Sequence, residues 1–70
     1  MADVKFNLIK HICSFSENKG YRKEINLISW DSKPPVVDIR NWMPNGRPGK
    51  GITLTPEEAR MVAEALLNEE

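Results

Sequence analysis

Cysteine and histidine are almost absent from this 70-residue chain, which has one of each, Cys13 and His11. A single cysteine excludes a disulfide within the chain, and one cysteine with one histidine argues against a metal site. We interpret both residues as packing residues of a strand, which is the usual role of such side chains. We therefore expect no cofactor.

Long apolar runs are missing as well. No stretch of about 18 consecutive apolar residues occurs, so the sequence predicts no membrane span and no membrane partner. The opening residues, MADVKFNLIK, lack the apolar core of a secretory signal peptide. A single cysteine also suits a reducing compartment. We expect a cytoplasmic protein, associated with the nucleoid if its source is bacterial.

The chain has no net charge at pH 7, yet its charges are separated along the sequence. Residues 1–54 contain nine Lys or Arg and five Asp or Glu, whereas residues 55–70 contain one Arg and five Glu. The net charge of zero is therefore the sum of a basic region and an acidic region that follows it. The surface built by the first region is basic.

Four strands and one helix are predicted by the residues that the chain does contain. β-branched and aromatic residues indicate strands at 6–16, 21–30, 36–42 and 52–54, separated by turn residues. The motif TPEE begins a helix with Thr55 as its cap and Glu58 closing a capping box, and the helix runs to about Leu67. The predicted fold class is α+β in the order ββββα, as one domain over residues 1–70.

Side-chain alternation divides the sheet into two faces. In the second and third strands one face is aliphatic, and the other carries Arg22, Trp30, Arg40 and Trp42. One helix covers only one face, so we expect the face with the tryptophans to be exposed unless something else covers it. The first strand breaks the alternation, which predicts either two covered faces or a β-bulge.

A partner subunit is expected because the chain is short. A domain of this size buries only about 60% of the surface that its unfolded form exposes. It usually needs a disulfide, a structural metal ion or a partner subunit for stability. The predicted helix has an apolar stripe that includes Val62 and Leu66, with Met61 and Leu67 at its edges. We expect a homodimer with Val62 and Leu66 in its interface.

Aromatic and basic residues on one sheet face favour nucleic-acid binding, because bases stack on aromatic rings while Lys and Arg follow the phosphates. The segment MPNGRPGKG at 43–51, expected to be a loop, adds Arg47 and Lys50 without an acid. Two interpretations of Trp30 and Trp42 stay open here. They stack on bases, or they fill the core or a dimer seam.

No catalytic constellation is recognisable in the sequence. No Ser/His/Asp set can be placed, and GRPGKG lacks the spacing and the Ser or Thr of a P-loop. We expect a protein that is not an enzyme and has no small-molecule substrate.

The segment VDIRNWMPNGRPGKGITLTPEEA, which begins at Val37, resembles the transcriptional coactivators of the positive-cofactor-four type. Their signature is Asp-Ile-Arg, an aromatic residue, a loop rich in Gly, Pro and Lys, Gly-Ile-Ser/Thr-Leu and a capped helix. Here it corresponds to Asp38-Ile39-Arg40, Trp42, NGRPGKG, Gly51-Ile52-Thr53-Leu54 and TPEE. The short form with an N-terminal hairpin is similar to the bacterial YdbC-type branch.

The resemblance implies a curved four-stranded antiparallel sheet, a C-terminal helix, and a homodimer with the two helices at its interface. It also implies binding of single-stranded DNA with little sequence preference, in transcription regulation or genome maintenance. RNA is the open alternative, because no residue identifies a reader of the 2′-hydroxyl. The family's binding positions carry over to Lys33, Arg40, Trp42, Arg47 and Lys50, and the alternation adds Arg22 and Trp30.

The sequence departs from the family at three places, which affect the strength of binding and the number of stacked bases. The loop after Trp42 is short, Met43 replaces a second aromatic residue, and Lys33-Pro34-Pro35 replaces a longer hairpin. The alternative function is a protein-interaction module in which the tryptophans anchor a partner.

Overall fold

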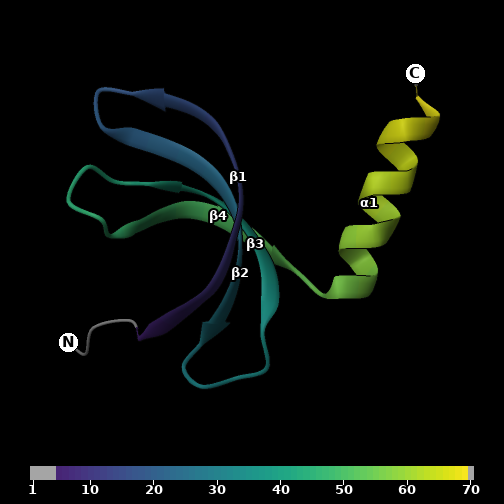
Figure 1. Ribbon diagram of the computed structural model, residues 1–70, viewed down its shortest axis with the longest axis horizontal. Coiled ribbons are helices and arrows are strands. Elements are labelled where there is room, and N and C mark those ends of the chain that lie inside the picture. Colours follow the sequence, from purple (N-terminus) through teal and green to yellow (C-terminus); the bar gives the residue numbers. More distant parts are fainter. Residues whose placement is uncertain (1–4, 70) are drawn as a thin grey trace.

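One antiparallel sheet and one helix form the described part of the chain, residues 5–69 of a computed structural model (Figure 1). The strands lie in the order β1-β2-β3-β4, so each strand pairs with its neighbours in sequence. This confirms the predicted ββββα order. The elements are β1 Phe6–Asn18, β2 Tyr21–Trp30, β3 Val36–Trp42, β4 Pro48–Leu54 and α1 Pro56–Asn68.

The fourth strand begins earlier than the sequence predicted. We expected a loop over residues 43–51, but β4 starts at Pro48, which pairs with Trp42, so only residues 43–47 connect the strands. The glycines suggested a loop, but they permit close strand contact instead. A Cβ atom at Gly51 would collide with Arg40 Cβ, and one at Gly49 would lie 2.7 Å from the Asn41 carbonyl oxygen.

Strand β1 is irregular and curved. Its 13 residues pair with the 10 residues of β2 because the register skips three times, at Ile9, Ile12 and Phe15. The broken alternation of the sequence is therefore explained by β-bulges, the second of the two predicted alternatives. Each bulge bends the strand and increases its twist.

The turns between strands are tight. Lys19 and Gly20 form the two-residue connection between β1 and β2, with φ angles of 53° and 86°. Two positive φ values are typical of the type I′ hairpin turn, which matches the twist of the flanking strands. A Cβ atom at Gly20 would meet the Pro44 side chain at 3.0 Å, so this turn lies against the β3–β4 connection.

The two faces of the sheet differ in burial. We call the face with Ile28, Trp30, Asp38, Arg40 and Trp42 the tryptophan face. The opposite face, which we call the aliphatic face, carries Ile25, Leu27, Val37, Ile39 and Ile52.

Burial is concentrated on the tryptophan face. Ile28, Asn26 and Asp38 are fully buried there, and Trp42 is only 4% exposed. The tryptophan face is therefore covered at Trp42, which lies in the core of the single chain. The sheet curls around this face, and Phe6 from the start of β1 packs against Trp42.

The helix begins as predicted but covers little. Thr55 Oγ1 accepts a hydrogen bond from the Glu58 backbone N–H (3.0 Å), and Glu58 Oε1 accepts one from the Thr55 N–H (2.9 Å), which confirms the capping box. The helix extends away from the sheet in Figure 1 and has no buried residue. No helix among the described residues is long and apolar enough to cross a membrane. The aliphatic face and the apolar stripe of α1 are thus both left open.

Candidate nucleic-acid interface

Three aromatic rings meet on the tryptophan face. The β1–β2 register places Phe6 opposite Trp30, and the centroid of the Phe6 ring lies 5.3 Å from that of Trp30 and 5.4 Å from that of Trp42. Both ring pairs are tilted, by 46° and 49°, a favourable arrangement for aromatic side chains. Sequence reasoning missed Phe6 as a member of this cluster, which we call the aromatic cluster.

Both indole N–H groups of the cluster are buried. The Nε1 atoms of Trp30 and Trp42 have no hydrogen-bond partner among the described residues. An unsatisfied buried donor costs about 1–3 kcal/mol. The two indole N–H groups therefore contribute no hydrogen bond that holds the cluster among the described residues.

Arg40 is fixed by its neighbours. Its Nε and Nη2 atoms donate to the Asp38 carboxylate at 2.8–3.1 Å, and Nη1 donates to the Gly49 carbonyl oxygen at 2.7 Å. The guanidinium also lies over the Trp30 ring, 4.8 Å from the ring centroid, which adds a cation–π attraction. Asp38 is fully buried and balances the charge of Arg40. Arg40 thus ties β3 to β4 and supports Trp30.

A second polar network lies beside this pair. Asn26 Nδ2 donates to Glu24 Oε1 (3.1 Å), which leaves Asn26 Oδ1 as the acceptor for His11 Nδ1–H at 2.6 Å. The other ring nitrogen of His11 lies 3.2 Å from Ser14 Oγ. Arg22 Nε is 3.7 Å from Glu24 Oε2, so a carboxylate also faces Arg22. His11 therefore serves a structural network in this chain, and both arginines of the tryptophan face have an acidic neighbour.

A groove brings together three of the predicted residues, Trp30, Lys33 and Arg40. Its volume is about 530 Å³. Lys33 is exposed in the turn after β2, and its backbone N–H donates to the Trp30 carbonyl oxygen (2.9 Å). The remaining walls of the groove are apolar or hydroxylic, and they are Pro34, Val36, Pro48 and Thr53.

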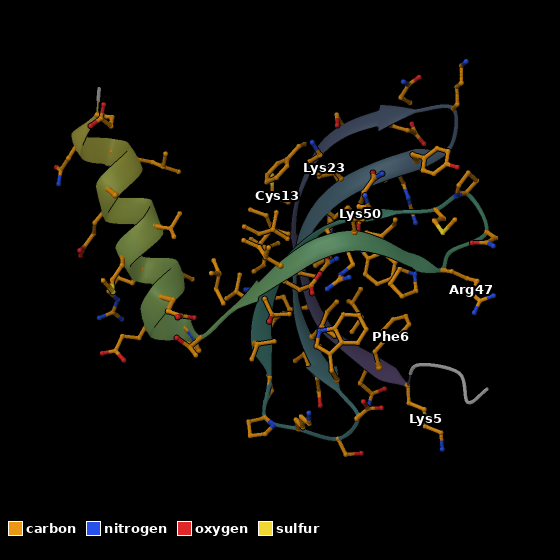
Figure 2. All side chains as sticks on the ribbon, turned by 180° about the vertical axis from the view of Figure 1, so that it is seen from behind. Lys5, Phe6, Cys13, Lys23, Arg47 and Lys50 are labelled. Atoms are coloured by element: carbon orange, nitrogen blue, oxygen red, sulfur yellow. The ribbon has the colours of Figure 1, made fainter. Side chains whose placement is uncertain are left out.

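Lys50 lies elsewhere, on the opposite side of the sheet. It lines a hollow of about 710 Å³ together with Tyr21 and Lys23, and this hollow has no acidic residue in its lining. Figure 2 shows Lys23 and Lys50 on one side of the sheet and Phe6 on the other. Arg47 is exposed at the tip of the β3–β4 connection. The seven predicted residues therefore do not form one compact site.

The described residues offer no metal centre. Within 5–69, no group of three or more His, Cys, Asp or Glu side chains is arranged to hold an ion. Cys13 is exposed on β1 and is a free thiol.

Comparison with known proteins assigns a family. The sequence pattern of the family described as Transcriptional Coactivator p15 (PC4) matches residues 17–65, more than half of the chain. An uncharacterized protein of Treponema pallidum (strain Nichols) is 41% identical over 44 residues, which are 61% of this chain and 52% of that protein. This chain therefore spans about half the length of that relative. The chain belongs to the PC4 coactivator family, as the resemblance implied, while its place in the bacterial branch stays a prediction.

Proposed function

We propose that this protein binds single-stranded DNA with little sequence preference, as a homodimer and without catalysis. The observation that carries the proposal is the groove of Trp30, Lys33 and Arg40 on the sheet of a PC4-family chain. Family membership supports DNA binding and a role connected with transcription. Genome maintenance is a second setting for the same activity, and single-stranded RNA is the alternative ligand.

The structure suggests different roles for the predicted residues. Trp30 contributes an aromatic wall to the groove, while Lys33 supplies a cation at its edge. Arg40 and Trp42 are packed beneath this surface, so we assign them the positioning of Trp30 and of the strands.

The phosphate track continues around the β3–β4 hairpin in this proposal. Arg47 at the tip and Lys50 on the other side of the sheet are both exposed and would follow the backbone of the strand. Arg22, which pairs with Trp42 beside the same hairpin, is exposed and extends this track. Such contacts position the nucleic acid without reading its sequence.

A second copy of the chain is the occupant that we propose for the open apolar surfaces. Val62 and Leu66 on α1 are 40% and 65% exposed, and Ile9, Ile12, Phe15 and Ile52 are exposed on the strands. Exposed apolar surface on this scale is typical of an interface. A dimer that covers α1 and the part of the aliphatic face away from the Lys50 hollow leaves both the tryptophan face and Lys50 open to nucleic acid. The acidic residues of α1 then lie away from the phosphates.

Titration of the native protein with oligo-dT, oligo-U and duplex DNA of equal length tests the proposal, with tryptophan fluorescence as the signal. We expect tight binding to single strands and weak binding to the duplex, because only unpaired bases can stack on the rings. Affinity should fall as salt increases, since phosphate contacts release counterions. Equal affinity for the duplex would refute base stacking. Absence of any salt-dependent binding would favour the protein-interaction module.

A further inference from the structure

We propose that Phe6 is the ring on which a nucleobase stacks at the aromatic cluster. This inference rests on the proposed binding of single strands and identifies a contact residue within it. Neither the sequence motif nor the matched family pattern, which begins at residue 17, includes Phe6.

Accessibility distinguishes the three rings of the cluster. Trp42 is 4% exposed, and the indole nitrogens of both tryptophans are buried. Phe6 is 37% exposed and packs on the two tryptophans. A base can therefore reach the Phe6 ring without any rearrangement, whereas stacking on Trp42 requires Phe6 to move. Binding surfaces usually change little between the free and bound states.

The surroundings of Phe6 fix its orientation. It belongs to a short ladder of three pairs, Phe6 with Trp30, Asn7 with Ser29 and Leu8 with Ile28, which ends at the first bulge. The two indole rings beneath restrict its rotation, so little side-chain entropy is lost when a base stacks on it. A ring held in this way is a preformed stacking platform.

Cations flank this platform. Lys5 precedes Phe6, and its carbonyl oxygen accepts the Asp31 backbone N–H (2.9 Å), which joins the start of β1 to the turn that carries Lys33. Lys5 and Lys33 are both exposed, and Lys5 extends outward beside Phe6 in Figure 2. Asp31 shares this corner, so the local balance is one positive charge. An aromatic platform with a lysine on each of the two adjoining segments fits one nucleotide, with the base on Phe6 and the neighbouring phosphates toward the lysines.

The conversion of Phe6 to leucine tests the assignment. Phe6→Leu keeps an apolar side chain on the tryptophans but removes the ring face. Its affinity for oligo-dT should fall by about five- to a hundredfold, the effect of losing one stacked base. Its affinity for an abasic strand of the same length should be unchanged, and Phe6→Tyr should bind oligo-dT like the native protein. Phe15→Leu is the control for loss of a ring elsewhere in the same strand, because Phe15 is 50% exposed outside the cluster and leucine keeps the apolar surface that the proposed dimer covers.

The possible results separate the inference from the function on which it rests. If the native protein does not bind oligo-dT, the proposed function fails. If the native protein binds and Phe6→Leu binds equally well, Phe6 is only a packing residue. Tighter binding by Phe6→Leu would show that Phe6 covers the tryptophans and that bases stack on those instead. Either of the last two results overturns the inference.

A measurement on the native chain covers the case in which Phe6→Leu does not fold. The chain has two phenylalanines, so labelling their rings gives two sets of NMR signals. On addition of oligo-dT the Phe6 signals should shift strongly, whereas the Phe15 signals should shift little. On addition of the abasic strand, both sets of signals should shift little. Unmoved Phe6 signals at saturating oligo-dT would refute the proposal.

Discussion

The two faces of the sheet bury their residues by different means. The tryptophan face contains charged and polar side chains, yet a single chain buries them, because the sheet curls and the Asp38–Arg40 and Glu24–Asn26–His11 networks satisfy their polar groups. The aliphatic face is more apolar but remains half-exposed, since α1 extends away from it. Curvature, rather than apolar content, decides which face becomes the core of the single chain.

A charge placed on the apolar stripe of α1 tests whether a second copy covers the aliphatic face. Leu66→Asp should abolish the dimer at micromolar concentration, because a carboxylate buried without a partner costs several kcal/mol. Leu66 is 65% exposed in the single chain, so the substitution acts mainly on association. Analytical ultracentrifugation measures the change in oligomeric state, and circular dichroism shows whether the separated chains stay folded.

Asn68→Asp is the control for that variant, because it adds the same charge to the same helix near its end. It should remain dimeric. A native protein that is a stable monomer, or a dimer unaffected by Leu66→Asp, would contradict the proposed use of the α1 stripe.

The second prediction concerns the core of the tryptophan face. Trp42→Ala should lower the free energy of unfolding by about 3–5 kcal/mol, the usual cost of truncating a buried tryptophan. Urea denaturation at a fixed protein concentration measures the change, since the stability of a dimer depends on concentration. Ile52→Ala on the aliphatic face, where the side chain is 58% exposed, should cost less. Equal destabilisation at the two positions would show that the dimer buries Ile52 as completely as the single chain buries Trp42.

The third prediction has the smallest expected effect and concerns charge at the β3–β4 hairpin. The double variant Arg47→Ala/Lys50→Ala should weaken binding to oligo-dT and flatten its salt dependence. Neutralising one cation that binds a phosphate of a single strand reduces the slope of log K against log[salt] by about 0.7, and a dimer doubles the number of altered sites. Affinities measured at several salt concentrations give this slope.

A charge-matched control keeps that test specific. Lys10→Ala/Arg60→Ala removes the same charge from β1 and from α1, outside the groove and the hollow. If it changes the slope as much as the hairpin variant does, net charge rather than the hairpin position determines the salt dependence.

The sequence predicted the elements well and their arrangement less well. Local residue patterns predict the strand order, the Thr55 cap and the irregularity of β1. The start of β4 was missed because Gly49 and Gly51 look like loop residues when the close approach of Asn41 and Arg40 is not known.

The aromatic cluster could not be predicted for a related reason. Counting back along a regular hairpin from the Asn18–Tyr21 pair places Ile9 opposite Trp30, whereas the three bulges move Phe6 into that position. The identity of the ring partner therefore depends on the number of bulges, which the sequence does not state. The burial of Trp42 follows from the same arrangement, because Phe6 packs on both tryptophans.

Strand β1 has 13 residues and its partner β2 has 10, which affects how β1 tolerates insertions and deletions during evolution. The outer strand of a bend follows the longer path, and each skipped residue lengthens that path without changing the pairs on either side. Removing Ile9, Ile12 or Phe15 would restore a regular ladder at that point and leave every other residue on its present face. Single-residue insertions and deletions, which reverse the faces of an ordinary strand, act here as adjustments of curvature. The curvature of the sheet can therefore vary between relatives while the residues on each of its faces stay the same.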